Sequence, residues 1–482
     1  MSGGLQDEQA RLAIAHPRIP FQRDSSVVRK KVHPIDKALD HFDDFYKQVF
    51  KKQWPSIREG LLAKPKYVAV INNFGDCEET MSKLELSGAL NMRTLFNLEK
   101  DYMKEELREN SNKQLLKQIM NLDKQLEKQA RQSKKTEEKP SEKIENTKNY
   151  SLEASLEHAE LDHLRIVDSK NALSTEILNE FVPATKIKGK EDFIPESTYY
   201  QMFDSTASSQ VKIEKDYNLN FPDNLNVYCY EMDNYNDFEP VKKSSTGVSN
   251  YYLMDGGSIL PVLALDLKPG SKVLDMCAAP GGKSLLAIQT LYPELVVSND
   301  LSNSRVNRIQ SVFNQFLYDF NEKWLDTEKI RLQNSDARFI EDLYYDRILV
   351  DVPCTTDRHS LKENDNNIFK PSRIKERLKL PELQAELLFN ALRIVKPGGV
   401  VVYSTCSLSP IQNDGVVSMA LRRIWEETKF NIVVKDLSIA LLQGRNVYNI
   451  AKRDTVKLGH LVLPSMKQNY GPTYFCKLKK IE

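Results

Sequence analysis

Short apolar runs alternate with stretches of helical spacing from about residue 248 to the end of the chain. Near-continuous apolar runs, rich in β-branched residues, lie at 348–352 and 400–404, and shorter apolar segments at 273–276, 295–298 and 330–332 also predict strands. Such runs are typical of strands that are buried on both faces of a sheet. The spacing between them predicts helices over 284–291, 304–320 and 381–395. The alternation indicates an α/β fold with a doubly wound, mostly parallel sheet, which an antiparallel hairpin of 461–464 and 473–478 would close.

The N-terminal region has a different pattern, in which large apolar residues recur at near-helical spacing. Ile35, Leu39, Phe42, Phe45, Tyr46 and Phe50 predict one helix. The segment Trp54-Pro55-Ser56-Ile57-Arg58 predicts a break and a restart, because proline favours the first turn of a helix.

These patterns divide the chain into four parts. We expect a basic arm at 1–31, a small helical region at 32–97 that packs on the catalytic domain, a charged and partly disordered linker at 98–215, and the catalytic domain at 216–482. In the linker, Leu115, Ile119, Leu122 and Leu126 form a stripe that is too short for a stable coiled coil. Residues 134–148 cannot bury enough apolar area to fold. The stripe is either a frayed helix or a helix that binds a partner.

Overall charge indicates no partner, since 68 basic side chains balance 67 acidic ones. An RNA-binding surface would therefore have to come from local patches. No apolar run approaches the roughly 20 residues that span a bilayer, so we expect a soluble protein. The basic arm, with Arg11, Arg18 and Arg23, suits an organelle transit segment, but Asp7 and Glu8 do not. The arm is either a targeting segment or a disordered extension.

Two of the six cysteines carry the strongest chemical signal. The six are scattered without a C-x-x-C pair, which argues against a structural zinc site and a disulfide scaffold. Cys354 and Cys406, however, each directly follow a predicted strand, where ligands of open α/β sheets bind. Polar neighbours and partial exposure favour a reactive thiol with a lowered pKa. Asp351, three residues before Cys354, would reach the same substrate. A buried, inert core position is the competing interpretation for each thiol alone.

A glycine-rich turn, Ala279-Pro280-Gly281-Gly282-Lys283-Ser284, also follows a predicted strand. It is no phosphate loop, because Cys277 stands where that motif needs glycine, and the dinucleotide fingerprint G-x-G-x-x-G is absent. Acids follow the next two strands, at Asp300 and Asp336. The first could accept both ribose hydroxyls and the second lies within reach of an adenine edge. The set predicts an adenosine site, and S-adenosylmethionine fits it better than a dinucleotide.

A basic segment follows the strand of Cys354 and should border the mouth of the site. Its cationic residues are Arg358, His359, Lys362, Lys370, Arg373, Lys375, Arg377 and Lys379. Contact with RNA phosphates is one interpretation. A solvated basic start of a helix, tempered by Glu363 and Glu376, is the other.

These motifs resemble those of the Sun-domain RNA cytosine-5 methyltransferases. The resemblance rests on Cys277-Ala278-Ala279-Pro280-Gly281-Gly282-Lys283, Asp351-Val352-Pro353-Cys354 and Ser404-Thr405-Cys406-Ser407, and it covers roughly 248–482. It implies a class I methyltransferase fold, of which a terminal hairpin is a feature. The family motif Asp-Ala-Pro-Cys-Ser-Gly differs here in Val352 and in Thr355-Thr356-Asp357-Arg358-His359-Ser360. That variant, with Tyr251-Tyr252-Leu253-Met254-Asp255 and the segment at 54–58, resembles the branch that acts on mitochondrial ribosomal RNA.

The resemblance implies roles for individual residues. Cys406 would attack carbon 6 of cytosine, Asp351 would protonate or hydrogen-bond ring nitrogen 3, and Cys354 would assist release after methyl transfer. The cofactor pocket for S-adenosylmethionine would be lined by Gly281, Gly282, Lys283, Asp300, Arg305, Asp336, Ala337 and Asp351. The target cytosine must be unstacked to reach the thiol. No metal is implied.

The resemblance also implies a mitochondrial location, ribosomal RNA as substrate and a role in ribosome assembly. A helical-repeat protein of the mitochondrial transcription-termination-factor family is the implied protein partner. Transfer RNA as substrate and a non-catalytic assembly factor are the alternatives. The second is disfavoured because a scaffold has no need of both thiols. DNA is disfavoured because DNA cytosine-5 enzymes use the Pro-Cys thiol as nucleophile and lack the second strand-end cysteine.

Overall fold

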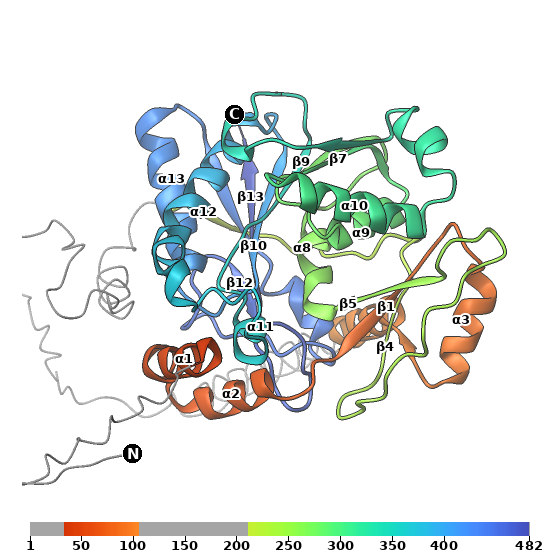
Figure 1. The fold of residues 1–482 in the computed structure, drawn as a ribbon, viewed down its shortest axis with the longest axis horizontal. Coiled ribbons are helices and arrows are strands. Elements are labelled where there is room, and N and C mark those ends of the chain that lie inside the picture. The colour runs from red at the N-terminus through yellow and green to blue at the C-terminus, as the bar shows by residue number, and fades with distance from the viewer. Residues whose placement is uncertain (1–32, 106–210, 482) are drawn as a thin grey trace, which may run out of the picture.

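The computed structural model describes residues 33–105 and 211–481, and Figure 1 shows how their elements are arranged. The predicted basic arm, the leucine stripe at 115–126 and the polar run at 134–148 lie outside these residues. None of the described helices is both long enough and apolar enough to cross a membrane.

The larger sheet has nine strands within the described residues, and its central part is parallel. The central strands are β6 (Ser271–Asp275), β7 (Pro293–Asn299), β8 (Ile330–Gln333), β9 (Arg347–Asp351) and β10 (Val400–Thr405). They lie in the order β10-β9-β6-β7-β8, and all four neighbouring pairs are parallel. Each of these strands contains a predicted apolar run, so the prediction of a doubly wound parallel sheet is confirmed.

The antiparallel end of this sheet is only partly as predicted. β12 (His460–Val462) pairs antiparallel with β13 (Thr473–Lys480), which confirms the hairpin. β13 also lies between β10 and β11 (Ile432–Asp436), antiparallel to both, and β3 (Ile213–Lys215) extends the edge. The sequence did not predict β11, because its apolar run is only three residues long and charged residues follow it.

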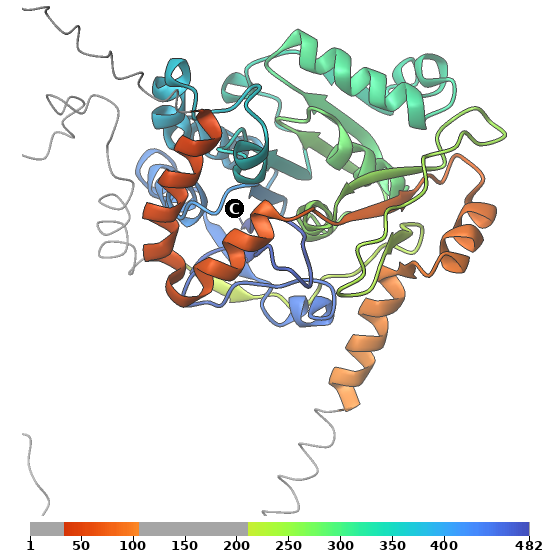
Figure 2. The same ribbon diagram turned by 60° about the horizontal axis from the view of Figure 1, so that its bottom comes forward.

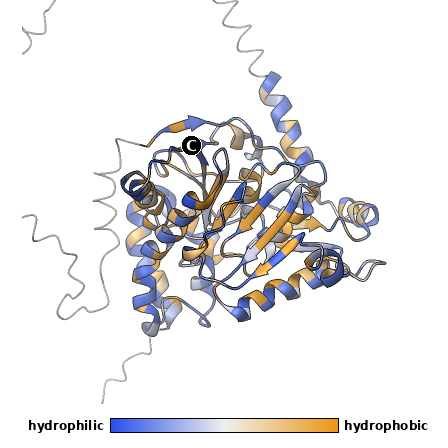
Figure 3. Ribbon diagram, turned by 90° about the horizontal axis from the view of Figure 1, so that it is seen from above, coloured by the Kyte–Doolittle hydropathy of each residue, from blue (hydrophilic) through white to orange (hydrophobic). Residues whose placement is uncertain are grey.

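Alternate residues of the central strands face two separate cores. Ile348, Val350 and Val401 belong to the core beneath α12 (Ile374–Ile394) and α13 (Val416–Glu427). Leu349 and Val402 belong to the opposite core, with α8 (Ile259–Ala264), α9 (Gly282–Gln289) and α10 (Asn303–Phe316). This is the period-two alternation of a strand covered on both faces. Figure 3 shows the apolar strands at the centre with helices around them.

The long helix α12 begins earlier than the sequence predicts. We expected a helix from 381, because proline is favoured in the first turn. In the structure Pro381 lies inside the helix, which begins at Ile374 after a short 3-10 turn, Pro371–Arg373.

The N-terminal region forms helices and also joins a second sheet. The predicted helix is α1 (Pro34–Phe50), the break is a 3-10 turn (Lys51–Gln53), and the restart is α2 (Trp54–Leu62). Most of the predicted apolar face is buried, including Phe42, Phe45, Tyr46 and Phe50. The helical region then continues into strands that the sequence did not predict, β1 (Tyr67–Ile71) and β2 (Leu90–Asn91).

The second sheet is formed by strands that precede residue 106 and strands that follow residue 210. Its order is β2-β4-β1-β5, with β4 (Val227–Cys229) and β5 (Tyr251–Asp255) pairing antiparallel to β1. Residues 67–91 and 227–255 therefore form one unit. α3 (Cys77–Leu86) lies beside this sheet, and a helix over 92–105 projects from the body of the molecule (Figure 2).

Candidate active site

The carboxyl ends of β6, β7, β9 and β10 meet at one edge of the sheet. The chain order reverses at β6, whose neighbours are β9 on one side and β7 on the other, and ligands of open α/β sheets bind at such a point. The pairing of Ser404 with Asp351 aligns the ends of β9 and β10. The loops that follow these two strands therefore start side by side.

This alignment brings the two predicted cysteines together. The Sγ atoms of Cys354 and Cys406 lie 2.9 Å apart, and the backbone N–H of Cys406 donates to Cys354 Sγ at 3.4 Å. Cys406 is exposed, whereas Cys354 is buried behind it. The structure thus brings the two predicted thiols together, with Cys406 as the accessible member.

Asp351 joins the thiol loops to the glycine turn. Its Oδ2 accepts a hydrogen bond from Lys283 Nζ at 2.7 Å, and its Oδ1 accepts one from Ser404 Oγ at 2.7 Å. Burial lowers the pKa of Lys283, but the Asp351 carboxylate outweighs burial, so the pKa is raised and the side chain stays an ammonium. Ser404, which we had not assigned a role, fixes the second carboxylate oxygen.

The pKa of Cys406 moves opposite to our prediction. The hydrogen bond with Cys354, the crowded surroundings of the sulfur and the nearby Asp351 carboxylate raise it well above the ordinary value, and Lys283 opposes them only in part. The predicted lowering was therefore wrong for the free protein. One cation cannot offset a thiol neighbour and a carboxylate that both disfavour a thiolate.

The glycine turn requires its glycines. Gly281 has φ of +108°, in the left-handed region that side chains disfavour, and a Cβ there would lie 3.3 Å from Ile309. A Cβ on Gly282 would lie 3.0 Å from the Tyr252 ring. Just before the turn, buried Asp275 accepts a hydrogen bond from Ser284 Oγ at 2.7 Å, and this ties strand β6 to the first turn of α9. We had not predicted a role for Asp275.

Asp300 and Arg305 lie against the glycine turn, as predicted. Asp300 is buried, and its Oδ2 forms an ion pair with Arg305 Nε at 3.2 Å. The Arg305 guanidinium also donates to the carbonyl oxygen of Ala279 at 3.2 Å. The N–H of Ser302 donates to Asp300 Oδ1 at 3.1 Å. The contacts fix the carboxylate at the end of β7, beside the turn.

Asp336 and Ala337 lie at the end of β8, but the Asp336 carboxylate is already engaged. Arg338 donates to both of its oxygens, with Nη2 2.7 Å from Oδ2, and these hydrogen bonds lower the pKa of Asp336. Ala337 is buried, and its carbonyl oxygen accepts a hydrogen bond from Asn390 at 2.8 Å. The two residues lie at the edge of the site, and Arg338 donates to both oxygens of Asp336.

At the start of the basic segment, two cations donate hydrogen bonds to backbone carbonyl groups of the protein. Arg358 donates to the carbonyl oxygens of Gly471 at 2.8 Å and of Gly60 at 3.0 Å. Lys362 Nζ donates to the carbonyl oxygen of Ala63 at 2.6 Å. These two cations anchor the end of α2, so the phosphate-contact interpretation is wrong for them. Sequence patterns could not indicate this, because the acceptors lie 113 to 299 residues away.

Comparisons with known proteins agree with these motifs. A family model described as 16S rRNA methyltransferase RsmB/F matches residues 262–459. The chain is 35% identical over 469 residues to 5-cytosine rRNA methyltransferase NSUN4 of Xenopus tropicalis, which covers 96% of this chain and 95% of that protein. It is 36% identical to the mitochondrial tRNA (cytosine(34)-C(5))-methyltransferase of Mus musculus, over 51% of this chain and 68% of that protein. A methyltransferase homologue from Pyrococcus horikoshii gives a TM-score of 0.48 at 16% identity, covering 93% and 98% of the two chains.

Proposed function

The chain belongs to the RsmB/F family of RNA cytosine-5 methyltransferases, and we propose that it methylates carbon 5 of a cytosine in ribosomal RNA. One observation carries the proposal: two thiols and a carboxylate meet at the ends of two adjacent parallel strands, beside a glycine turn. The larger sheet has the order of class I methyltransferases, with an antiparallel strand inserted near one edge. The family is S-adenosylmethionine-dependent.

The thiol pair supports covalent catalysis. Carbon 5 of cytosine is a poor nucleophile until a thiolate adds at carbon 6, which makes carbon 5 enamine-like. We assign the attack to Cys406, because it is the exposed thiol. Its raised pKa means that a proton must leave Cys406 when the substrate binds. Asp351, held by Lys283 and Ser404, is placed to hydrogen-bond ring nitrogen 3 as charge develops there.

Cys354 is assigned to the release step. After methyl transfer, the proton on carbon 5 must be removed so that the bond between Cys406 and carbon 6 can break. Cys354 Sγ lies 2.9 Å from Cys406 Sγ, so it is close enough to act at the same ring. Because Cys354 is buried behind Cys406, it is poorly placed to make the first attack.

The residues beside the glycine turn suit an adenosine-containing cofactor. Bound there, S-adenosylmethionine supplies an electrophilic methyl group. The Asp300 carboxylate is the acceptor for ribose hydroxyls, and Gly281 and Gly282 let the turn pack closely against Ile309 and Tyr252. Arg305, Asp336 and Ala337 line the edge. Lys283 and Asp351 lie between this pocket and the thiols, where the methyl group must point.

Ribosomal RNA is favoured over transfer RNA by the length of the match. The ribosomal-RNA enzyme from Xenopus tropicalis aligns over 95% of its length, and the mitochondrial transfer-RNA enzyme over 68%. We place the protein in mitochondria on the strength of the family resemblance and of that mitochondrial relative. A helical-repeat protein of the mitochondrial transcription-termination-factor family is the proposed partner, and ribosome assembly the proposed process.

Bisulfite sequencing tests this function directly. Depletion of the protein should remove one 5-methylcytosine from the small-subunit ribosomal RNA of mitochondria, and re-expression should restore it. Restoration by the wild-type chain, but not by Cys406→Ala, would assign the methylation to this active site. Loss of the mark from a transfer RNA, with the ribosomal RNA unchanged, would favour the alternative substrate. Fractionation of the tagged chain outside mitochondria would contradict the proposed location.

A further inference from the structure

Asp357 is a buried carboxylate that lies directly behind the two thiols. It begins α11 (Asp357–Lys362) and has no exposed surface. Four groups donate to its oxygens: Thr355 Oγ1 at 2.5 Å, Leu408 N at 2.7 Å, Tyr46 Oη at 2.8 Å and Ser407 Oγ at 3.2 Å. Its own N–H donates to the carbonyl oxygen of Cys406 at 3.3 Å. Asp357 belongs to the stretch in which this chain departs from the usual Pro-Cys-Ser-Gly motif.

These donors come from three separate parts of the chain. Thr355 directly follows Cys354, while Ser407 and Leu408 directly follow Cys406. Tyr46 lies on α1, 311 residues before Asp357. The hydroxyl oxygens of Thr355 and Ser407 also lie 2.8 Å apart, so either hydroxyl can donate to the other instead of to Asp357. One carboxylate therefore joins both cysteine loops to each other and to the N-terminal helix.

We propose that Asp357, held by Tyr46, is a positioning residue that sets the distance between Cys354 and Cys406. The proposal rests on the proposed covalent function, which needs both sulfurs at one cytosine ring. Asp351 links the ends of the two strands through Ser404, and Asp357 links the loops that follow them. The N-terminal helix thus forms part of the scaffold of the active site through one hydroxyl group.

The surrounding contacts explain why Tyr46 can do this. Its ring packs against Phe42, with centroids 4.9 Å apart, and against Trp54, at 5.5 Å, so the hydroxyl is held at a fixed place. Arg358 and Lys362 connect the end of α2 to α11, the helix that begins at Asp357. The segment at 54–58 and the motif variant at 355–360 are therefore packed together in the fold.

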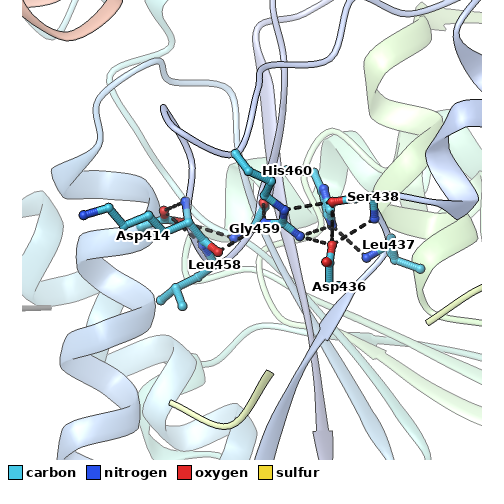
Figure 4. A network of polar contacts seen from close by, with 9 residues as sticks. Asp414, Asp436, Leu437, Ser438, Leu458, Gly459 and His460 are labelled. Atoms are coloured by element: carbon cyan, nitrogen blue, oxygen red, sulfur yellow. Dashed lines mark hydrogen bonds and ion pairs between the residues drawn. The ribbon is translucent and has the colours of Figure 1, made fainter. Parts of the chain in front are cut away.

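A second buried carboxylate provides a matched control. Asp414 accepts a hydrogen bond from Tyr474 Oη at 2.6 Å and from the backbone N–H groups of Lys457, Leu458 and Gly459. Figure 4 shows this network, in which Asp414 faces Leu458 and Gly459, and His460 faces Asp436 and Leu437. Asp414 supports the loop before β12 and contacts neither cysteine. Tyr46 and Tyr474 are equally buried, so Tyr46→Phe and Tyr474→Phe each remove one buried donor to a carboxylate.

The test compares these two variants by a reaction that needs both thiols in place. RNA that contains 5-fluorocytosine should leave the wild-type enzyme covalently bound, because the fluorine at carbon 5 cannot leave as a proton does. Tyr46→Phe should form this adduct about tenfold more slowly at saturating S-adenosylmethionine, since small misplacements of reacting atoms are costly. Tyr474→Phe should react at the wild-type rate. Both should bind S-adenosylmethionine normally.

A second measurement reports the thiol distance without any methyl transfer. Phenylarsine oxide condenses with two close thiols, forming two As–S bonds and releasing water, and Cys406→Ala gives the background. Tyr46→Phe and Asp357→Ala should capture it less well than wild type and Tyr474→Phe. Asp357→Asn keeps an acceptor for Leu408 N–H, so its capture of phenylarsine oxide should lie between that of the wild type and that of Asp357→Ala.

The outcomes separate this proposal from the proposed function. Equal adduct rates and equal arsenical capture in Tyr46→Phe and Tyr474→Phe would overturn the positioning role, whether or not the enzyme is active. If the wild-type enzyme forms no RNA adduct, the covalent function is overturned. If capture of phenylarsine oxide is nevertheless reduced only in Tyr46→Phe and the Asp357 variants, the positioning role remains supported. Adduct formation slowed in Tyr46→Phe together with reduced capture supports both.

Discussion

The two halves of the site differ in where their residues find their partners. In the cofactor half, at the ends of β6, β7 and β8, partners lie close in sequence: Asp300 pairs with Arg305, and Asp336 with Arg338. In the thiol half, at the ends of β9 and β10, they lie far away. Lys283 reaches Asp351 over 68 residues, and Tyr46 reaches Asp357 over 311. The first half is built by local turns, whereas the second is assembled by the whole fold.

The largest expected effect is a loss of methyl transfer that leaves cofactor binding unchanged. Cys406→Ala removes the proposed nucleophile and should abolish methyl transfer, because no other exposed thiol lies at this site. It should leave S-adenosylmethionine binding unchanged, since the residues of the glycine turn do not depend on the sulfur. Radiolabelled methyl transfer and calorimetry would measure the two properties. Comparable loss of cofactor affinity would show that the halves are not independent.

A smaller effect should appear in the cofactor half alone. Asp300→Ala removes an acceptor for ribose hydroxyls, and a hydrogen bond to a charged group contributes about 1.5–3 kcal/mol. The affinity for S-adenosylmethionine should fall by roughly ten- to a hundredfold. Asp336→Ala is the comparison variant, and its effect should be smaller because Arg338 donates to both oxygens of Asp336, whereas Arg305 pairs with one oxygen of Asp300. Unchanged affinity in folded Asp300→Ala would place the cofactor elsewhere.

A different kind of effect, on stability, concerns Asp275, below the glycine turn. Burial raises its pKa from the ordinary 3.8 to about 7. Between these pH values the folded state holds a proton on Asp275 that the unfolded state lacks. The stability that this residue contributes is therefore fully present below pH 4 and is lost as the pH rises through 7. Asp275→Asn cannot titrate. The difference in unfolding free energy between the two proteins should change by about 1.4 kcal/mol per pH unit within that window. A pH-independent difference would contradict the raised pKa.

The same contrast explains what could be predicted from the sequence. The strands, the glycine turn, Asp300 and both cysteines were predictable, because apolar runs and strand-end motifs are local. The roles of Arg358 and Lys362 were not, since their acceptors Gly60, Ala63 and Gly471 are recognisable only in the fold. β11 was missed because its apolar run is too short. The raised pKa of Cys406 depends on Cys354 and Asp351, whose closeness to it only the pairing of β9 with β10 creates.

The central claim, that the two thiols have different tasks, is tested most directly by trapping the covalent intermediate. Cys354→Ala should form a protein–RNA adduct that survives denaturing electrophoresis, because Cys406 can still add to cytosine but release is blocked. Cys406→Ala and the double variant should form none. An adduct with Cys406→Ala and none with Cys354→Ala would reverse the two roles. Full methyl transfer by both single variants, without any adduct, would contradict the covalent account.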